Sequence, residues 1–254
     1  MIERIVVWFS AGVTSAIAAK IAVERYSEII PIHLVNCDTG SEDEDNLRFM
    51  NDVSDWLNIP LEIIRNEKYK NTFDVYDQTG FFKNQHGAKC TVELKKKPRM
   101  KYQNLATDLQ VFGFDAHEER RAQRFIDNNL EVRSWFPVLE AGYSKDNCRE
   151  ILFNAGIKEP RTYAEGFHNA NCLAAGCVKG GIGYWNHIRK VRPVVFWNMA
   201  TKEREIGFAL LAKETTGEHG ERIKIPVFLD ELSPEDGNYK TDPSFQCSLF
   251  CGQF

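Results

Sequence analysis

Five of the seven cysteines occupy positions that suit metal binding or thiol chemistry. Four of them form two close pairs, where short spacing lets two thiolates reach one ion and nearby glycines can turn backbone N–H groups toward sulfur. A thiolate can also act as a nucleophile, and a buried cysteine can pack as a small apolar residue. All three interpretations stay open for Cys90, Cys172, Cys177, Cys247 and Cys251. We expect the other two, Cys37 and Cys148, to pack within structural elements.

The first strand-to-helix turn has the composition of a phosphate-binding loop. An apolar run at 4–9 leads into a hydroxyl- and glycine-rich stretch at 10–15, which opens an alanine-rich helix. Free N–H groups and the positive end of the dipole at a helix start attract anions, and glycine allows close backbone approach. An ordinary N-capped helix is the alternative. The candidate ligands are Ser10, Gly12, Thr14 and Ser15.

Charged residues follow the later predicted elements. Asp38 comes after the second apolar run and could hold a ribose or a metal, or serve as a plain turn residue. Lys95 and Lys96 follow Cys90 closely and could bind phosphate or sulfate, or form a solvated helix face. Arg121 follows the fourth strand, where its guanidinium could clamp a phosphate or pair with a glutamate on a surface helix.

A basic and aromatic stretch at 179–192 contains Tyr184 and Trp185. Such a cluster can dock a nucleic-acid end or a nucleotide base. The alternative is that Trp185 belongs to the core.

Alternating strand and helix patterns must position these residues. The expected strands are 4–9, 29–35, 61–64, 110–114 and 132–136. The expected helices are 14–26, 42–57, 72–79, 92–105 (broken or restarted at Pro98) and 117–127. This order predicts an α/β fold with a doubly wound, mostly parallel five-stranded sheet. Ligands bind at the carboxyl ends of such strands, where the Ser10 turn, Asp38 and Asp115 should meet.

The pattern changes after Pro137. The expected helices are 144–155, 184–191 and 193–213, with loops at 163–183 and 233–254 and a strand at 223–229. We therefore predict a nucleotide-binding α/β domain at 1–137 and a helical, cysteine-bearing region at 138–254 packed on it.

Composition limits the class of protein. The 254 residues are 43% hydrophobic, carry a net charge of −4 and contain no apolar run long enough to span a membrane. The negative net charge disfavours a broad surface that binds along nucleic acid, although it leaves room for local basic patches. The first residues lack a secretory signal. We expect a cytoplasmic protein, in which the cysteines are metal ligands or thiols rather than disulfides.

These motifs together resemble the phosphoadenosine phosphosulfate (PAPS) reductase-like branch of the adenine nucleotide alpha-hydrolase (PP-loop) superfamily. Residues 9–15 are similar to the PP-loop, S-G-G-x-D-S, and 90–98 to its Cys-x-x-x-(Leu/Ile)-(Lys/Arg)-Lys segment. Residues 112–122 are similar to the arginine motif of that branch. The stretches 171–186 and 247–251 resemble the cysteine elements of bacterial and phage members.

The resemblance implies a parallel sheet whose first loop binds the phosphate of ATP or a PAPS-like nucleotide, and in several members a [4Fe-4S] cluster. Ser10, Gly12 and Ser15 would then bind phosphate, and Arg121 would pair with an anionic group. The cluster ligands or sulfur-handling residues would be Cys90, Cys172 and Cys177. Zinc is the alternative metal.

Two departures from the family pattern lie in the loop. Ala11 replaces a glycine, and Thr14 replaces the aspartate that is expected to help bind Mg²⁺ in ATP pyrophosphatases. Magnesium therefore stays open as a cofactor, and reductase-like chemistry is favoured over ATP hydrolysis. The C-terminus, Cys251 to Phe254, only partly matches the Glu-Cys-Gly-x-His tail of assimilatory enzymes.

Three functions follow from these features. The first is thiol-dependent reduction of an adenylylated sulfate, with Cys251 as mobile nucleophile, Cys90 and Arg121 in support, and an outside thiol or sulfur donor protein. The second is sulfur transfer to an adenylated nucleic-acid base, with 179–192 binding the acceptor. The third is a non-catalytic nucleotide-binding module with structural zinc. A homodimer remains open in each case.

Overall fold

The computed structural model describes residues 1–170 and 172–240. Two predicted site residues, Cys247 and Cys251, lie outside these ranges. None of the helices in the described part is long and apolar enough to cross a lipid bilayer.

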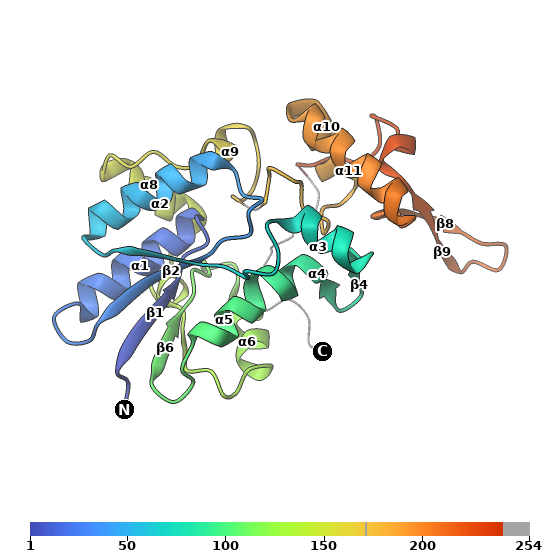
Figure 1. Ribbon diagram of the computed structural model, residues 1–254. Helices are drawn as coiled ribbons and strands as arrows, with labels where there is room; N and C mark the ends of the chain where they lie inside the picture. Colours follow the sequence, from blue (N-terminus) through green and yellow to red (C-terminus); the bar gives the residue numbers. More distant parts are fainter. Residues whose placement is uncertain (171, 241–254) are drawn as a thin grey trace.

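A five-stranded parallel sheet forms the centre of the molecule (Figure 1). The strand order is β3-β2-β1-β6-β7, and the register pairs Ile5 of β1 with Ile32 of β2 and Leu109 of β6. The strands are β1 (Arg4–Trp8), β2 (Ile32–Cys37), β3 (Leu61–Ile64), β6 (Asp108–Val111) and β7 (Ser134–Trp135). The predicted α/β fold with five mostly parallel strands is confirmed.

Helices cover both faces of this sheet. Ile5 and Val7 of β1 pack with α1 (Val13–Tyr26), α2 (Glu44–Leu57) and α8 (Lys145–Asn154). Val6 and Trp8 point to the other face, where α6 (Glu119–Asp127) packs. Successive side chains of a strand alternate between faces, so an apolar run is buried on both sides.

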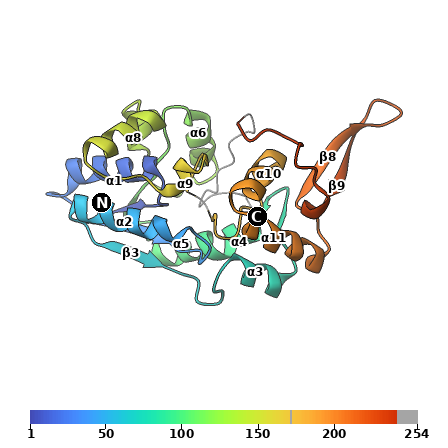
Figure 2. The ribbon, with the colours of Figure 1, turned by 90° about the horizontal axis from the view of Figure 1, so that it is seen from above.

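A second hydrophobic core lies beside the sheet, built around Trp185 and Phe196. It brings together α3 (Thr72–Thr79), the helical segments α4 (Lys89–Thr91) and η1 (Val92–Lys96), α10 (Ile182–Val191) and α11 (Pro193–Ile206). In Figures 1 and 2, α10 and α11 lie next to each other and near α3 and α4. Residues before and after Pro137 contribute both to the core between the sheet and α1 and to the core around Trp185. The domain boundary expected at Pro137 stays a prediction.

Of the break or restart expected at Pro98, the structure has a restart: α5 (Lys97–Tyr102) begins at Lys97, with Pro98 in its first turn. The chain stays helical from Lys89 to Tyr102, passing through the π-helical segment η1 into α5. Pro98 occupies the first turn of α5, and the wider π-helical turn before it accommodates a residue without an N–H group.

The predicted helix 193–213 is too long. The helix α11 ends at Ile206, because Gly207 takes the left-handed conformation with φ of 73°. The chain then forms an antiparallel hairpin of β8 (Leu211–Thr216) and β9 (Arg222–Val227), which projects from the body in Figure 1.

The remaining elements are short. They are β4 (Lys83–Asn84) and β5 (Gly87–Ala88), which pair as a hairpin, α7 (Pro137–Glu140), α9 (Arg161–Ala164), which overlaps the start of the predicted loop 163–183, and η2 (Leu229–Glu231).

Candidate functional site

The loop between β1 and α1 ends at the start of a helix, where the Ser15 N–H donates to the Gly12 carbonyl at 3.1 Å. Gly12 is the N-cap residue and has no side-chain cap, and the Val13 N–H lies 3.5 Å from the Tyr163 hydroxyl. The buried Ser15 donates from Oγ to the Gly12 carbonyl at 2.8 Å, whereas Ser10 is exposed. Thr14 is half-buried in the first turn of α1. A helix N-terminus in this form attracts an anion.

Ala11 adopts the conformation that the family's glycine would take. Its φ is 58°, in the left-handed region, although its side chain is fully buried. Left-handed backbone costs an L-residue about 1–2 kcal/mol, and glycine avoids that cost. Ala11 thus takes a backbone conformation that favours glycine, at the position where the motif that the sequence resembles has glycine.

Two neighbouring strands hold this loop in place. From β2, Asn36 donates its side-chain N–H to the Phe9 carbonyl at 2.8 Å, and Asn36 itself is buried. After β6, Gly113 lies against the first turn of α1. The approach is so close that a Cβ at this position would come within 2.5 Å of the Ser15 backbone. The turn thus rests on buried contacts from both sides.

The loop after β2 carries a group that the sequence analysis missed. Asp38 accepts from the Gly40 N–H at 2.7 Å and pairs with Arg65 at 2.6 Å, as a turn residue would. Burial raises the pKa of the nearby Glu42 to about 7, and the charge of Asp38 adds to this, while Lys95 opposes it. A glutamate that titrates near neutrality is suited to proton transfer, but a single sequence contains no signal for it.

The predicted phosphate-binding cations are engaged with protein groups. Arg121 pairs with Glu118, and its guanidinium lies 4.2 Å from the centre of the Phe114 ring. Lys95 is buried in η1 and Lys96 is half-buried beside it. One Nη of Arg121 contacts Glu118, and a guanidinium has further N–H groups with which it could bind a phosphate.

Three predicted cysteines lie near one tyrosine. Burial raises the pKa of Tyr76, and so do the neighbouring thiols of Cys90, Cys177 and Cys172. The N–H of Cys177 donates to the Tyr184 hydroxyl at 2.9 Å, and the Cys172 sulfur lies 3.2 Å from the hydroxyl of Thr39. Segments far apart in the chain thus bring three thiols to the region beside the sheet edge.

The described residues alone do not provide a complete metal site. Within 1–170 and 172–240, no group of three or more His, Cys, Asp or Glu side chains is gathered closely enough to hold an ion. The predicted five-cysteine metal set includes two residues outside those ranges, so it stays a prediction.

The remaining cysteines pack as expected, and the 179–192 stretch is largely structural. Burial raises the pKa of Cys37 and of Cys148 to about 12, which makes both thiols unreactive. Tyr184 and Trp185 are fully buried, so the core interpretation of these two rings is correct. Gly176 explains part of this packing, because a Cβ there would lie 2.3 Å from the Trp185 ring.

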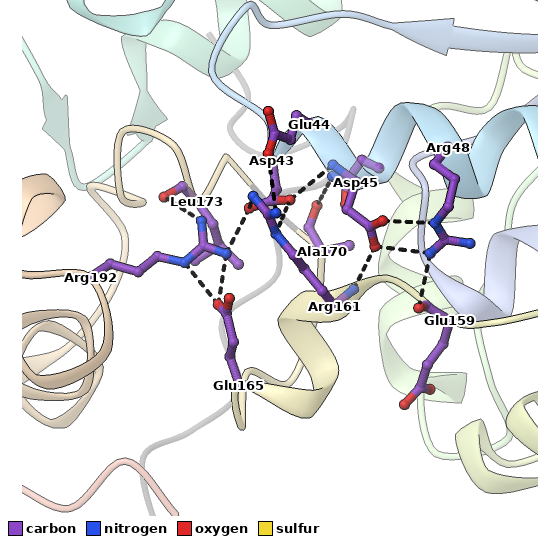
Figure 3. Close-up of polar contacts among 11 residues, drawn as sticks. Asp43, Glu44, Asp45, Arg48, Glu159, Arg161, Glu165, Ala170, Leu173 and Arg192 are labelled. Atoms are coloured by element: carbon purple, nitrogen blue, oxygen red, sulfur yellow. Dashed lines mark hydrogen bonds and ion pairs between the residues drawn. The ribbon is translucent and has the colours of Figure 1, made fainter.

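A buried ion-pair network anchors the loop after β2. Figure 3 shows Arg161 and Arg192, from different segments, pointing at Asp43. The distances are 2.9 Å from Arg161 Nε and 2.6 Å from Arg192 Nη2 to the Asp43 carboxylate oxygens, and Glu165 also pairs with Arg192. Burial alone would raise the pKa of Asp43, but hydrogen bonds from the Asp45 backbone and both arginines lower it overall.

The chain was compared with protein-family models, with curated protein sequences and with solved structures. No protein-family model and no curated protein sequence matches it significantly. The PAPS reductase from Candida auris, in a phosphate complex, is 10% identical with a TM-score of 0.46, over 67% of this chain and 79% of that chain. The U34-tRNA thiolase NcsA from Methanococcus maripaludis, with its [4Fe-4S] cluster, is 14% identical with a TM-score of 0.48, over 86% of this chain and 77% of that chain. Both structures belong to the PP-loop superfamily, which the motifs of this chain resemble.

Proposed function

We propose that this chain is a PAPS reductase-like enzyme that uses cysteine thiols on the sulfur of an adenylylated substrate. The nucleotide phosphate would bind to the amides of the loop at 9–15 and the hydroxyl of Ser10. Asp38 would face the ribose from the adjacent loop.

The contact between Thr39 and Cys172 carries this proposal. It joins the loop at the carboxyl end of β2 to a thiol that is 133 residues away in the sequence. Ligands of parallel sheets bind at that edge. A thiol held there lies on the side of the sheet where the phosphate loop opens.

The reaction uses two thiols. A cysteine thiolate, for which Cys251 is the predicted residue, attacks the sulfur of the adenylylated sulfate. The S–O bond breaks, the adenosine phosphate leaves, and a cysteine thiosulfonate forms. We assign the second thiol to Cys172. Its thiolate attacks the cysteine sulfur of the thiosulfonate, which releases sulfite and leaves a disulfide, and an outside dithiol donor reduces that disulfide.

The chain's other residues have supporting roles in this scheme. Arg121 would pair with the anionic substrate. The half-buried Lys83 lies near Cys177, where burial lowers its pKa and the charge of the thiolate opposes that change. A [4Fe-4S] cluster remains the cofactor that the resemblance predicts, and no step above depends on it.

Sulfite release tests the proposal. The purified protein is incubated with PAPS and a dithiol, and sulfite and adenosine bisphosphate are measured. We expect both products in equal amounts. In a single turnover with reduced protein and no added dithiol, the Cys172→Ser variant should stop before sulfite release and accumulate a sulfonated cysteine, which intact-mass spectrometry detects. The control Cys148→Ala removes a core thiol and should still release sulfite.

Two results would contradict the proposal. One is the absence of binding by any adenine nucleotide in calorimetry. The other is full sulfite release by Cys172→Ser. Pyrophosphate release from ATP with tRNA as acceptor, in place of sulfite from PAPS, would assign the chain to sulfur transfer.

A further inference from the structure

Three hydroxyl groups gather around Gly12 at the start of α1. A Cβ added to Gly12 would lie 3.8 Å from the hydroxyl oxygens of Ser15 and Tyr163. It would lie 3.6 Å from the Ser10 hydroxyl. Two of these groups belong to the first turn itself, whereas Tyr163 comes from α9, 150 residues after Val13. A side chain from the second half of the chain therefore reaches this turn at its glycine.

The hydrogen bonds of these hydroxyls leave one proton without an acceptor. Ser15 donates to the Gly12 carbonyl at 2.8 Å, and the Ser10 hydroxyl lies 3.4 Å from Ser15 Oγ. The Tyr163 oxygen accepts a long hydrogen bond, 3.5 Å, from the Val13 N–H, because an amide N–H can only donate. Among the residues that the structure describes, none accepts the Tyr163 proton in return. The phenol therefore has its single proton to offer to a ligand.

The Tyr163 ring is fixed where its hydroxyl meets the start of α1. Only 9% of the residue is exposed, and the ring belongs to the core between the sheet and α1. The guanidinium of Arg149 lies 5.5 Å from the centre of the ring. The backbone of α9 is held as well, because Arg161 pairs with Asp43 at 2.9 Å and its N–H donates to Asp45 at 2.8 Å (Figure 3). A donor fixed in this way loses little freedom when it binds a ligand.

The chemistry around Gly12 favours an anion. The helix α1 has 14 residues, and no side chain caps its first turn. The positive end of the helix dipole therefore faces the three hydroxyls. Burial raises the pKa of Tyr163 to about 12, although the Val13 N–H opposes this, so the hydroxyl keeps its proton at neutral pH. A neutral donor beside a helix start complements a phosphate oxygen.

We propose that Tyr163 is a phosphate-binding residue: its hydroxyl donates a hydrogen bond to the nucleotide phosphate that the loop at 9–15 would hold. This role rests on the proposed function only for the presence of a phosphate at that loop, and it needs neither the cysteines nor sulfur chemistry. It gives the region after Pro137 a direct part in nucleotide binding.

Calorimetry with ATP and with inorganic pyrophosphate tests this role. Tyr163→Phe keeps the ring and removes only the hydroxyl. The affinity for both probes should fall about tenfold in this variant, since a hydrogen bond to a charged acceptor is lost. Pyrophosphate has the phosphates without a nucleoside, so an equal fall for the two probes assigns the contact to phosphate. Urea unfolding without ligand checks the fold, and Tyr163→Met replaces the phenylalanine variant if that one does not fold.

A matched control removes a tyrosine hydroxyl away from this loop. Tyr102 lies at the end of α5 on the other face of the sheet, and its hydroxyl donates to Glu62 at 2.6 Å. We expect Tyr102→Phe to bind both probes with the affinity of the unchanged protein. An equal fall in Tyr102→Phe would overturn the proposal.

Three other results would overturn it as well. In the first, Tyr163→Phe binds as tightly as the unchanged protein or more tightly, so the hydroxyl only caps α1 or occupies the place of the anion. In the second, the affinity falls for ATP alone, which places the hydroxyl at the nucleoside. In the third, the unchanged protein binds neither probe. Because no thiol takes part in these measurements, a failed sulfite assay leaves a tenfold effect of Tyr163→Phe standing, and an unaffected Tyr163→Phe leaves the sulfite assay undecided.

Discussion

At the scale of single residues, the loop between β1 and α1 holds an alanine in a backbone conformation that favours glycine. Ala11 is fully buried and has φ of 58°. The neighbouring contacts of Asn36 with the Phe9 carbonyl and of Gly113 with Ser15 hold the backbone around it. A strained conformation of this kind persists only where surrounding contacts impose it.

Substitutions at Ala11 should separate backbone strain from side-chain burial. Ala11→Gly removes the left-handed strain but also a buried methyl group, and the two effects nearly cancel, to within about 1 kcal/mol. Ala11→Val adds a β-branched side chain at positive φ in a filled space and should lower the unfolding free energy by at least about 2 kcal/mol. Urea unfolding measures both changes. Equal stability of the valine variant and the unchanged protein would mean that this φ is not maintained in solution.

At the scale of elements, one carboxylate fastens the β8–β9 hairpin to α11. Glu203 is fully buried and accepts the N–H of Leu210 just before β8 and the N–H of Leu229 just after β9, at 2.5 and 2.6 Å. Both ends of a projecting hairpin therefore depend on a single side chain of the preceding helix. An isolated two-stranded hairpin is only marginally stable in water.

Glu203 should make stability depend on pH. Burial raises its pKa from 4.5 to about 7, although the two N–H donors oppose this. Its contribution is fully present below the unfolded-state pKa and is lost as the pH rises through the folded-state pKa. Relative to Glu203→Gln, which does not titrate, the unchanged protein should lose on the order of 2–3 kcal/mol between about pH 4.5 and about pH 8. Urea unfolding at several pH values measures the difference, and parallel pH profiles for the two proteins would refute it.

At the scale of the whole molecule, the Asp43 network connects the sheet to the segments that carry the cysteines. Asp43 caps α2, and the arginines that reach it come from α9 and from the junction of α10 and α11. Its side chain is 1% exposed, so the two guanidinium groups neutralise a charge that water does not reach. The same network places Arg192 against Leu173, next to Cys172.

Asp43→Asn should destabilise the protein. Arg161 keeps Glu44 and Arg192 keeps Glu165, so the cost is that of weakened hydrogen bonds at a buried acceptor, about 1–3 kcal/mol. Asp52→Asn is the control, since Asp52 pairs with Arg48 at the surface and should contribute less than about 1 kcal/mol. Urea unfolding compares the two. Similar losses for both variants would show that the Asp43 network is not a buried anchor.

The sequence by itself determined the sheet, most of the helices and the place of the first strand-to-helix turn. Apolar runs with alternating helices define parallel strands, and the helix predicted to begin at Ser144 does so, with Ser144 forming a capping box with Asn147 at the start of α8. These features depend on neighbours a few residues apart. The same local patterns misled at 193–213, where apolar residues after Gly207 form a strand because they pair with 222–227.

Only the tertiary structure decided which side chains meet. The contact of Thr39 with Cys172 and the pairing of Asp43 with Arg192 join segments more than a hundred residues apart, and no periodicity records such pairs. The burial of Trp185, the raised pKa of Glu42 and the pairing of Arg121 with Glu118 also depend on surroundings supplied by the fold. Residue types indicate what chemistry a side chain can perform, whereas its partners and its solvent exposure are set by packing.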